Sequence, residues 1–157
     1  MASERRLVLD ANILMRAVLG RRVRQIIETH REHAAFFAPD VALADAQRHL
    51  PAIILKRDGD DAAVVAALEA LEAVGRNVAE VAAEAYAAHR AAALARIEQR
   101  DPDDWPILAT AMALDCPVWT EDNDFFGTGV PTWTSDRVEL YLAGPPSRWS
   151  GWPHARQ

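Results

Sequence analysis

Aspartates stand at three places where the sequence predicts a strand to end or a helix to begin. Asp10 follows the short apolar segment 7–9, and Asp122 follows a second such segment, 117–120. Asp104 lies at the start of a predicted helix that precedes the second segment. In an open parallel sheet, the loops at the carboxyl ends of the strands meet in one crevice, and a helix that precedes a strand begins at the same edge. We therefore expect Asp10, Asp104 and Asp122 to share one pocket.

Carboxylates gathered in one pocket raise one another's pKa, because neighbouring like charges disfavour ionisation. A hard divalent cation relieves this repulsion, and Mg²⁺ or Mn²⁺ prefers carboxylate oxygens together with water and a substrate phosphate. Such a cation can activate water for hydrolysis of a phosphodiester, so no protein nucleophile is required. The sequence contains no P-loop, dinucleotide-binding glycine pattern or nucleophile elbow that would indicate another chemistry.

Each of these aspartates also has a purely structural interpretation. Asp103 or Asp104 could cap the helix that begins there, and Asp122 and Asp124 could be turn residues. Asp10 is harder to explain in this way, because a buried carboxylate is unfavourable unless it is paired or bound to a metal. The histidines show no metal-binding motif, and we interpret them as residues of the surface or of helix faces: His30, His33, His49, His89 and His154.

The elements that position these residues alternate between strands and helices. Short strands are expected at 7–9, 35–38, 78–81, 117–120 and 130–132. Helices are expected from Ile13 with a break at Gly20, from Pro39 to the turn at 58–61, as a pair within the alanine-rich stretch 62–95, at 104–114, and up to Leu142. Pro51 should kink or restart the second of these helices, and Ser135 can cap the last. This alternation indicates an α/β fold with a parallel sheet that is covered on both faces.

Length and composition are those of one folded domain. The chain has 157 residues, of which 50% are hydrophobic, and a formal charge of -6, which excludes wholesale disorder. Charged residues interrupt each apolar stretch and no secretory leader is visible, so the expected location is the cytoplasm, with no membrane association. Cys116 is the only cysteine, which excludes an internal disulfide and a multi-cysteine zinc site.

Charge is distributed unevenly along the chain. Residues 1–57 contain ten Lys and Arg against six Asp and Glu, whereas residues 58–157 contain seven against seventeen. The acidic part could be simply a solvated face. The basic part contains four arginines that could contact the phosphates of a nucleic acid, or that could be ordinary solvated residues: Arg16, Arg21, Arg22 and Arg24.

Three segments, taken in order, resemble the PIN domain family over nearly the whole chain. They are Leu-Val-Leu-Asp10-Ala-Asn12-Ile-Leu, Asp104-Trp-Pro-Ile-Leu-Ala-Thr-Ala and Val-Trp-Thr120-Glu-Asp122-Asn-Asp124-Phe-Phe. The resemblance implies a three-layer α/β/α sandwich with a central, mostly parallel sheet over residues 1–143. Residues 144–157 are then an irregular tail, in which Trp149 and Trp152 could anchor to this domain or to a partner.

The same resemblance implies roles for individual residues. It assigns metal binding to Asp10, Asp104 and Asp122, and support of the site to Asn12, Thr120 and Asp124. The family usually has a glutamate in the helix after the second strand, where this chain has Asp45. Asp45 is therefore a fourth catalytic candidate with a shorter reach, which binds the cation directly or through water. Alternatively, it pairs with Arg48 or His49 one helical turn further on.

Many PIN proteins are Mg²⁺- or Mn²⁺-dependent ribonucleases, and they include the VapC-type toxins of toxin–antitoxin pairs. The resemblance thus implies an endoribonuclease that leaves 5′-phosphate products on single-stranded or loop RNA, with an antitoxin protein and a second copy of the chain as partners. One alternative is a catalytically inactive PIN-fold module that binds RNA or a protein. A phosphatase with Asp10 as nucleophile is disfavoured, because Asn12 stands where that chemistry needs a second acid.

Overall fold

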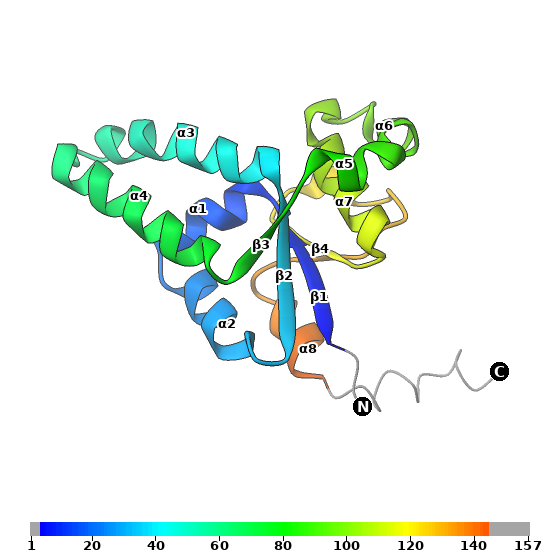
Figure 1. Ribbon diagram of the computed structural model, residues 1–157, viewed down its shortest axis with the longest axis horizontal. Coiled ribbons are helices and arrows are strands. Elements are labelled where there is room, and N and C mark those ends of the chain that lie inside the picture. The colour runs from blue at the N-terminus through cyan, green and yellow to red at the C-terminus, as the bar shows by residue number, and fades with distance from the viewer. Residues whose placement is uncertain (1–3, 145–157) are drawn as a thin grey trace.

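A five-stranded sheet lies at the centre of the computed structural model, which describes residues 4–144. The strands follow the order β3-β2-β1-β4-β5, and every neighbouring pair is parallel (Figure 1). Their bounds are β1 Arg5–Leu9, β2 Ala34–Pro39, β3 Val78–Val81, β4 Val118–Trp119 and β5 Thr132–Trp133. The predicted tail, with Trp149 and Trp152, falls on residues 145–157, outside the described residues.

The middle of the sheet is buried on both faces, as the apolar sequence of its strands predicts. Leu7, Val8 and Leu9 are fully buried in β1. In the register between β1 and β4, Leu9 lies beside Trp119. Because the two strands are parallel and end together, the residues that follow them, Asp10 and Thr120, come to the same edge of the sheet.

Helices cover both faces of the sheet (Figure 1). One layer contains α1 (Ala11–Leu19), α2 (Arg22–His30), α3 (Asp40–Lys56) and α4 (Asp61–Gly75). The other contains α5 (Ala83–Tyr86), α6 (Arg90–Ile97) and α7 (Trp105–Leu114), while α8 (Val138–Ala143) contacts α2. The predicted α/β/α sandwich with a parallel sheet is therefore confirmed. Within residues 4–144, no helix has the length and apolar character needed to cross a membrane.

Two predictions about helices are wrong, and a third is wrong in part. The helix α3 continues through Pro51 and does not restart there, while a kink at Pro51 stays a prediction; the buried residues Ala46 and Leu50 lie on the turns before the proline. The second helix of the alanine-rich stretch is divided into α5, the one-turn helix η1 (Ala87–His89) and α6. Ser135 does not cap α8, which begins at Val138; its hydroxyl instead accepts a hydrogen bond from the indole of Trp119 at 3.0 Å.

Candidate metal centre

Asp10 is fixed at the junction between β1 and α1 by two hydrogen bonds. One carboxylate oxygen caps α1 by accepting the backbone N–H of Ile13 at 2.9 Å. The other accepts the hydroxyl of Thr120 at 2.5 Å, across the parallel pair of β1 and β4. Asp10 is only 7% exposed. The parallel topology thus places the predicted supporting residue Thr120 directly against the predicted ligand Asp10.

A chain of hydrogen bonds continues from Thr120 into the loop after β4. The backbone N–H of Asp122 donates to the hydroxyl oxygen of Thr120 at 2.9 Å. The carboxylate of Asp122 in turn caps the one-turn helix η3 (Asn123–Phe125) by accepting the N–H of Asp124, also at 2.9 Å. Asp122 and Asp124 therefore do have the turn role that was one interpretation of them. The same loop holds Asp122 close enough to Asp10 for their charges to interact.

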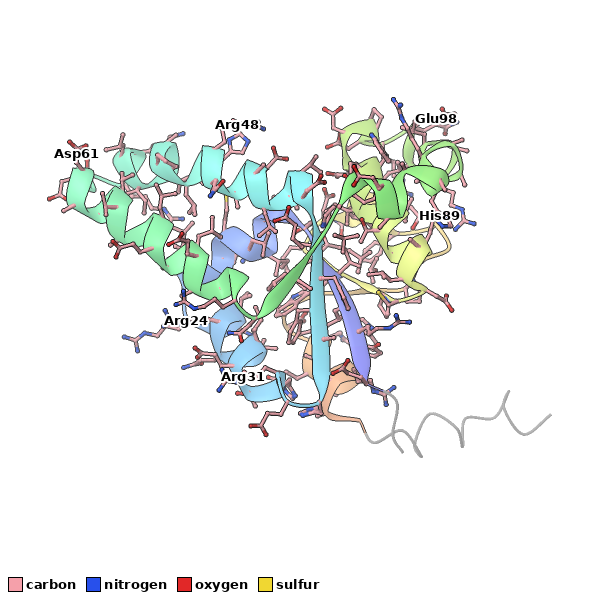
Figure 2. All side chains as sticks on the ribbon, in the orientation of Figure 1. Arg24, Arg31, Arg48, Asp61, His89 and Glu98 are labelled. Carbon is pink, nitrogen blue, oxygen red and sulfur yellow. The ribbon has the colours of Figure 1, made fainter. Side chains whose placement is uncertain are left out.

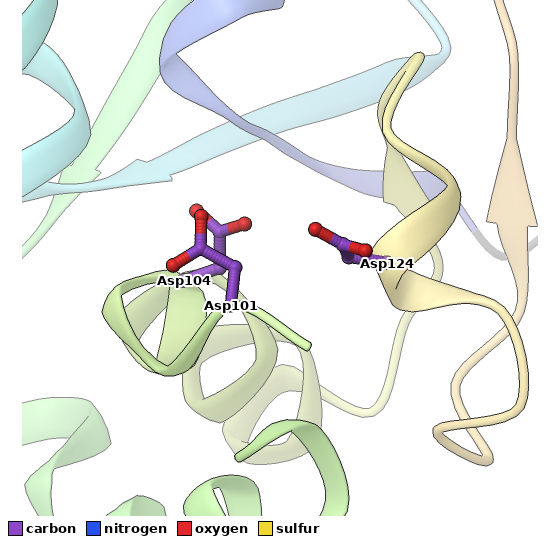
Figure 3. A group of neighbouring side chains, drawn as sticks. All are labelled: Asp101, Asp104 and Asp124. Carbon is purple, nitrogen blue, oxygen red and sulfur yellow. The ribbon is translucent and has the colours of Figure 1, made fainter. Parts of the chain in front are cut away.

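A second group of carboxylates faces this loop from the start of α7. Asp101, Asp104 and Asp124 each have one carboxylate oxygen within 4.8 Å of the others (Figure 3). Asp104 stands at the N-terminus of α7, but its side chain makes no capping hydrogen bond. The capping interpretation of Asp104 is therefore wrong, and its carboxylate is directed to the acidic cluster instead.

Sequence reasoning missed Asp101. Its carboxylate accepts the N–H of Asp103 and thereby caps the one-turn helix η2 (Pro102–Asp104), which precedes α7. This turn brings Asp101 back beside Asp104. The Asp-Pro pair at 101–102 is a sequence signal for such a turn, because proline favours the first position of a helix.

The pKa values show that the carboxylates repel one another. Burial, and then the charges of Asp122 and Glu121, raise the pKa of Asp10 to about 6, although the hydrogen bonds from Thr120 and Ile13 oppose this. Burial raises the pKa of Asp104 to about 7, with further contributions from four carboxylates: Asp101, Asp122, Asp10 and Asp124. All these groups therefore lie in one anionic site. A set of hard oxygen donors that disfavour one another's charge fits a divalent cation such as Mg²⁺ or Mn²⁺.

Asp45 and Asn12 lie differently. Asp45 is on α3, where its carboxylate accepts a hydrogen bond from Arg48, the pairing expected from their spacing. It is not in the group of Asp101, Asp104 and Asp124. Asn12 lies in the first turn of α1, two residues after Asp10, and its side chain is exposed. Roles for Asp45 in catalysis and for Asn12 in support of the site stay predictions.

The four predicted RNA-binding arginines separate into two places. Arg16, Arg21 and Arg22 line a groove together with Asn12, close to the carboxylates. Arg24 instead lines a smaller hollow between α2 and α4. Figure 2 labels Arg24 on α2 and Arg31, the residue that follows this helix.

Thr120 provides a first test of the metal centre. Thr120→Val removes the hydrogen bond to Asp10 and the acceptor for the N–H of Asp122. Loss of residues that orient metal ligands weakens metal affinity about 10- to 100-fold, and we expect Mn²⁺ binding, measured by calorimetric titration, to fall within this range. Thr120→Ser keeps the hydroxyl and should bind Mn²⁺ nearly as the native protein does. Unchanged affinity in Thr120→Val would show that the hydroxyl does not organise the site.

Comparison with solved structures agrees with the fold. No protein with a curated description matches the chain in sequence. Among solved structures, a Pyrobaculum aerophilum protein is similar with a TM-score of 0.67 and 19% identity, over 91% of this chain and 97% of that one. VapBC2 from Rickettsia felis, bound to a DNA fragment from its promoter, has a TM-score of 0.65 and 13% identity, over 82% of this chain and 98% of that one. FitAcB from Neisseria gonorrhoeae has a TM-score of 0.61 and 19% identity, over 82% of this chain and 97% of that one.

These likenesses, at such low identity, concern the fold. The family itself is given by the sequence, since the profile of the PIN domain matches residues 8–143. This match spans nearly all the described residues, from β1 to the end of α8, and includes every carboxylate of the acidic site. The chain therefore belongs to the PIN domain family.

Proposed function

We propose that the protein is an endoribonuclease that depends on Mg²⁺ or Mn²⁺ and hydrolyses phosphodiester bonds of RNA. The observation that carries the proposal is the cluster of Asp101, Asp104 and Asp124, whose carboxylate oxygens lie within 4.8 Å of one another, with Asp10 and Asp122 close enough to help raise the pKa of Asp104. Membership of the PIN domain family, whose toxin members are generally nucleases, supports it.

In this proposal Asp10, Asp104 and Asp122 hold the cation, with Asp101 and Asp124 beside them. A bound Mg²⁺ or Mn²⁺ would supply Lewis acidity, which lowers the pKa of the attacking water and stabilises negative charge on the phosphate. Thr120 is a positioning residue that holds one oxygen of Asp10 and the backbone of Asp122. Because Asp10 and Asp104 have raised pKa values, binding of the cation releases protons and strengthens as pH rises through about 6 to 7.

The biological role we propose is that of a toxin in a toxin–antitoxin pair, acting in the cytoplasm as a homodimer and controlled by an antitoxin protein. Similar solved structures support this role: VapBC2 of Rickettsia felis, and a toxin–antitoxin complex from Klebsiella pneumoniae with a TM-score of 0.55 and 18% identity over 82% of this chain and 97% of that one.

Cleavage of RNA by the purified protein tests the proposed activity. We expect a single-stranded RNA to be cut into 5′-phosphate products when Mg²⁺ or Mn²⁺ is present, and to stay intact in EDTA. Asp122→Asn, purified in parallel, controls for a contaminating nuclease. If the native protein binds Mn²⁺ and RNA but cuts none of the RNAs offered, the catalytically inactive PIN module is the better description.

A further inference from the structure

The carboxylates of the metal centre stand on two segments that are separate in the chain. Asp101 and Asp104 lie on the α7 segment, residues 100–104, and Asp124 lies across from them on the β4 loop, residues 121–131 (Figure 3). Their carboxylate oxygens are within 4.8 Å of one another. Because like charges at this separation repel one another, other contacts must hold the two segments together.

Two arginines connect the β4 loop to the opposite side of the site. Arg100 donates from its guanidinium to the backbone carbonyl of Asn123 at 2.9 Å. Arg96, in the last turn of α6, donates to the carbonyl of Thr128 at 3.2 Å. Among the described residues, these are the hydrogen bonds that join α6 and the α7 segment to the β4 loop.

The backbone of the β4 loop passes close to both guanidinium groups. Gly127 and Gly129 have positive φ angles of 83° and 87°, a conformation that residues with a side chain rarely adopt. A Cβ atom at Gly129 would lie 3.3 Å from a guanidinium nitrogen of Arg96, and one at Gly127 would lie 3.8 Å from a guanidinium nitrogen of Arg100. The two glycines therefore shape the loop to fit against the arginines.

The hydrogen bond of Arg100 lies beside a carboxylate on each side of the site. Arg100 precedes Asp101 in the chain, and Asn123, whose carbonyl it binds, precedes Asp124. In the part of the chain that the structure describes, the guanidinium of Arg100 forms no ion pair. It therefore joins the two sides of the site through the backbone and does not occupy the carboxylate oxygens that would bind a cation.

We propose that Arg100 is a positioning residue that fixes the distance between the two sides of the metal centre, and thereby makes the site selective for a small cation. The inference rests on the proposed function and adds to it a determinant of cation size. Mg²⁺ requires a nearly ideal arrangement of oxygens at about 2.0–2.1 Å, whereas Ca²⁺ accepts irregular coordination at about 2.3–2.6 Å. A site whose two sides are held at a fixed distance therefore favours Mg²⁺, and a loosened site loses this preference.

Calorimetric titration of Arg100→Ala with Mg²⁺ and with Ca²⁺ tests this role. We expect the affinity for Mg²⁺ to fall about 10-fold, as for loss of a residue that orients metal ligands, and the affinity for Ca²⁺ to change by less than about 3-fold. The charge of Arg100 alone predicts the opposite sign, because removal of a positive charge beside the site strengthens the binding of both cations. Arg100→Lys keeps the charge and an N–H donor, and should recover most of the preference for Mg²⁺. Gln99→Ala, at the exposed neighbouring position, is the matched control and should bind both cations as the native protein does.

Hydrogen exchange in EDTA tests the same role without a cation. The N–H of Phe126 bonds at 3.1 Å to the carbonyl of Asn123 that Arg100 also binds. In Arg100→Ala the amide of Phe126 should exchange about 10-fold faster, as for loss of one hydrogen bond. The amide of Ile13, which Asp10 holds on the other side of the site, should exchange as in the native protein. The inference is overturned if Phe126 exchanges at the native rate, if both cations bind Arg100→Ala more tightly, or if the ratio of the two affinities is unchanged.

The two proposals can fail separately. If the native protein cuts RNA with Mg²⁺ while Arg100→Ala keeps the native preference for Mg²⁺ over Ca²⁺, the role of Arg100 is wrong and the nuclease stands. If Arg100→Ala loses this preference and its β4 loop exchanges faster, but the native protein cuts no RNA, the role of Arg100 stands and the proposed activity fails. If Arg100→Ala weakens only the binding of RNA in EDTA, Arg100 is a substrate contact and the inference is overturned. Circular dichroism of each variant establishes that it is folded.

Discussion

Replacing Asp10 with asparagine is expected to raise the free energy of unfolding of the metal-free protein at pH 8 by about 3 kcal/mol, and to lower RNA cleavage by more than about 100-fold. The gain in stability is expected because burial raises the pKa of Asp10 from 3.8 to about 6. An ionised Asp10 therefore destabilises the folded state above pH 6. Asparagine removes this charge and keeps the shape of the side chain, but it is a poorer ligand for a divalent cation.

The pH dependence of this gain has a definite sign. A carboxyl with a raised pKa holds more protons in the folded than in the unfolded protein, so the free energy of unfolding falls as pH rises between the two pKa values. For Asp10 this interval runs from 3.8 to about 6. Asp10→Asn should therefore match the native protein below about pH 4, and reach its full advantage above about pH 6.

Urea unfolding in EDTA at pH 4 and pH 8 measures the effect. Asp103→Asn is the matched control, because Asp103 is exposed in the same acidic loop and loses the same charge. Its free energy of unfolding should change by less than about 0.5 kcal/mol. Added Mn²⁺ should stabilise the native protein and not Asp10→Asn. Equal stability of Asp10→Asn and the native protein at pH 8 would show that the ionised carboxylate of Asp10 does not destabilise the folded protein.

Sequence reasoning could place Asp10 and Asp122 together because it needed only two facts: both follow apolar strands, and such strands are parallel in an alternating α/β chain. It could not identify Asp101 as part of the cluster. The position of that carboxylate depends on the one-turn helix η2, whose local geometry turns it back toward Asp104. It also could not exclude a capping role for Asp104, because that depends on one side-chain torsion.

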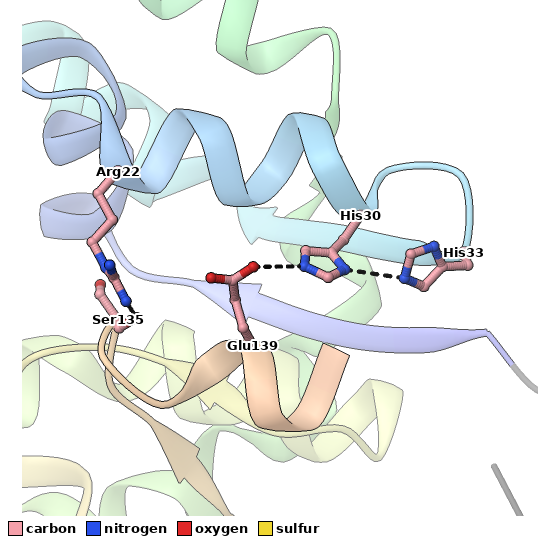
Figure 4. A network of polar contacts seen from close by, with 5 residues as sticks. All are labelled: Arg22, His30, His33, Ser135 and Glu139. Atoms are coloured by element: carbon pink, nitrogen blue, oxygen red, sulfur yellow. Dashed lines mark hydrogen bonds and ion pairs between the residues drawn. The ribbon is translucent and has the colours of Figure 1, made fainter. Parts of the chain in front are cut away.

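His30 illustrates a second limit. The sequence predicts a residue of the surface or of a helix face, yet His30 is buried, with its two ring nitrogens 2.9 Å from Glu139 and 3.0 Å from His33 (Figure 4). Glu139 lies on α8, 109 positions away in the chain. Arg22 likewise bonds to the carbonyl of Ser135, which precedes α8. Contacts of α2 with α8 and with the residues before α8 depend on tertiary packing, which no local pattern specifies.

Trp119→Ala should destabilise the protein by about 3–5 kcal/mol, the range for truncation of a fully buried tryptophan. Trp119 is completely buried in β4, where its indole donates to the hydroxyl of Ser135. It also lies immediately before Thr120, so its packing fixes the residue that orients Asp10. We therefore expect Trp119→Ala to weaken Mn²⁺ binding as well as stability, when both are measured below the unfolding temperature.

Trp133→Ala is the matched control for this prediction. Trp133 lies beside Trp119 in the neighbouring strand β5, but it is only half-buried. Its indole N–H has no hydrogen-bond partner within residues 4–144, and its ring stacks on that of Tyr141, with the ring centroids 5.6 Å apart. Trp133→Ala should lower the free energy of unfolding in urea by only about 1–2 kcal/mol. It removes less buried apolar area than Trp119→Ala does, and only one ring contact. Equal losses of stability in the two variants would contradict the prediction. They would show that Trp119 in the core of the sheet stabilises the fold no more than Trp133 at its edge.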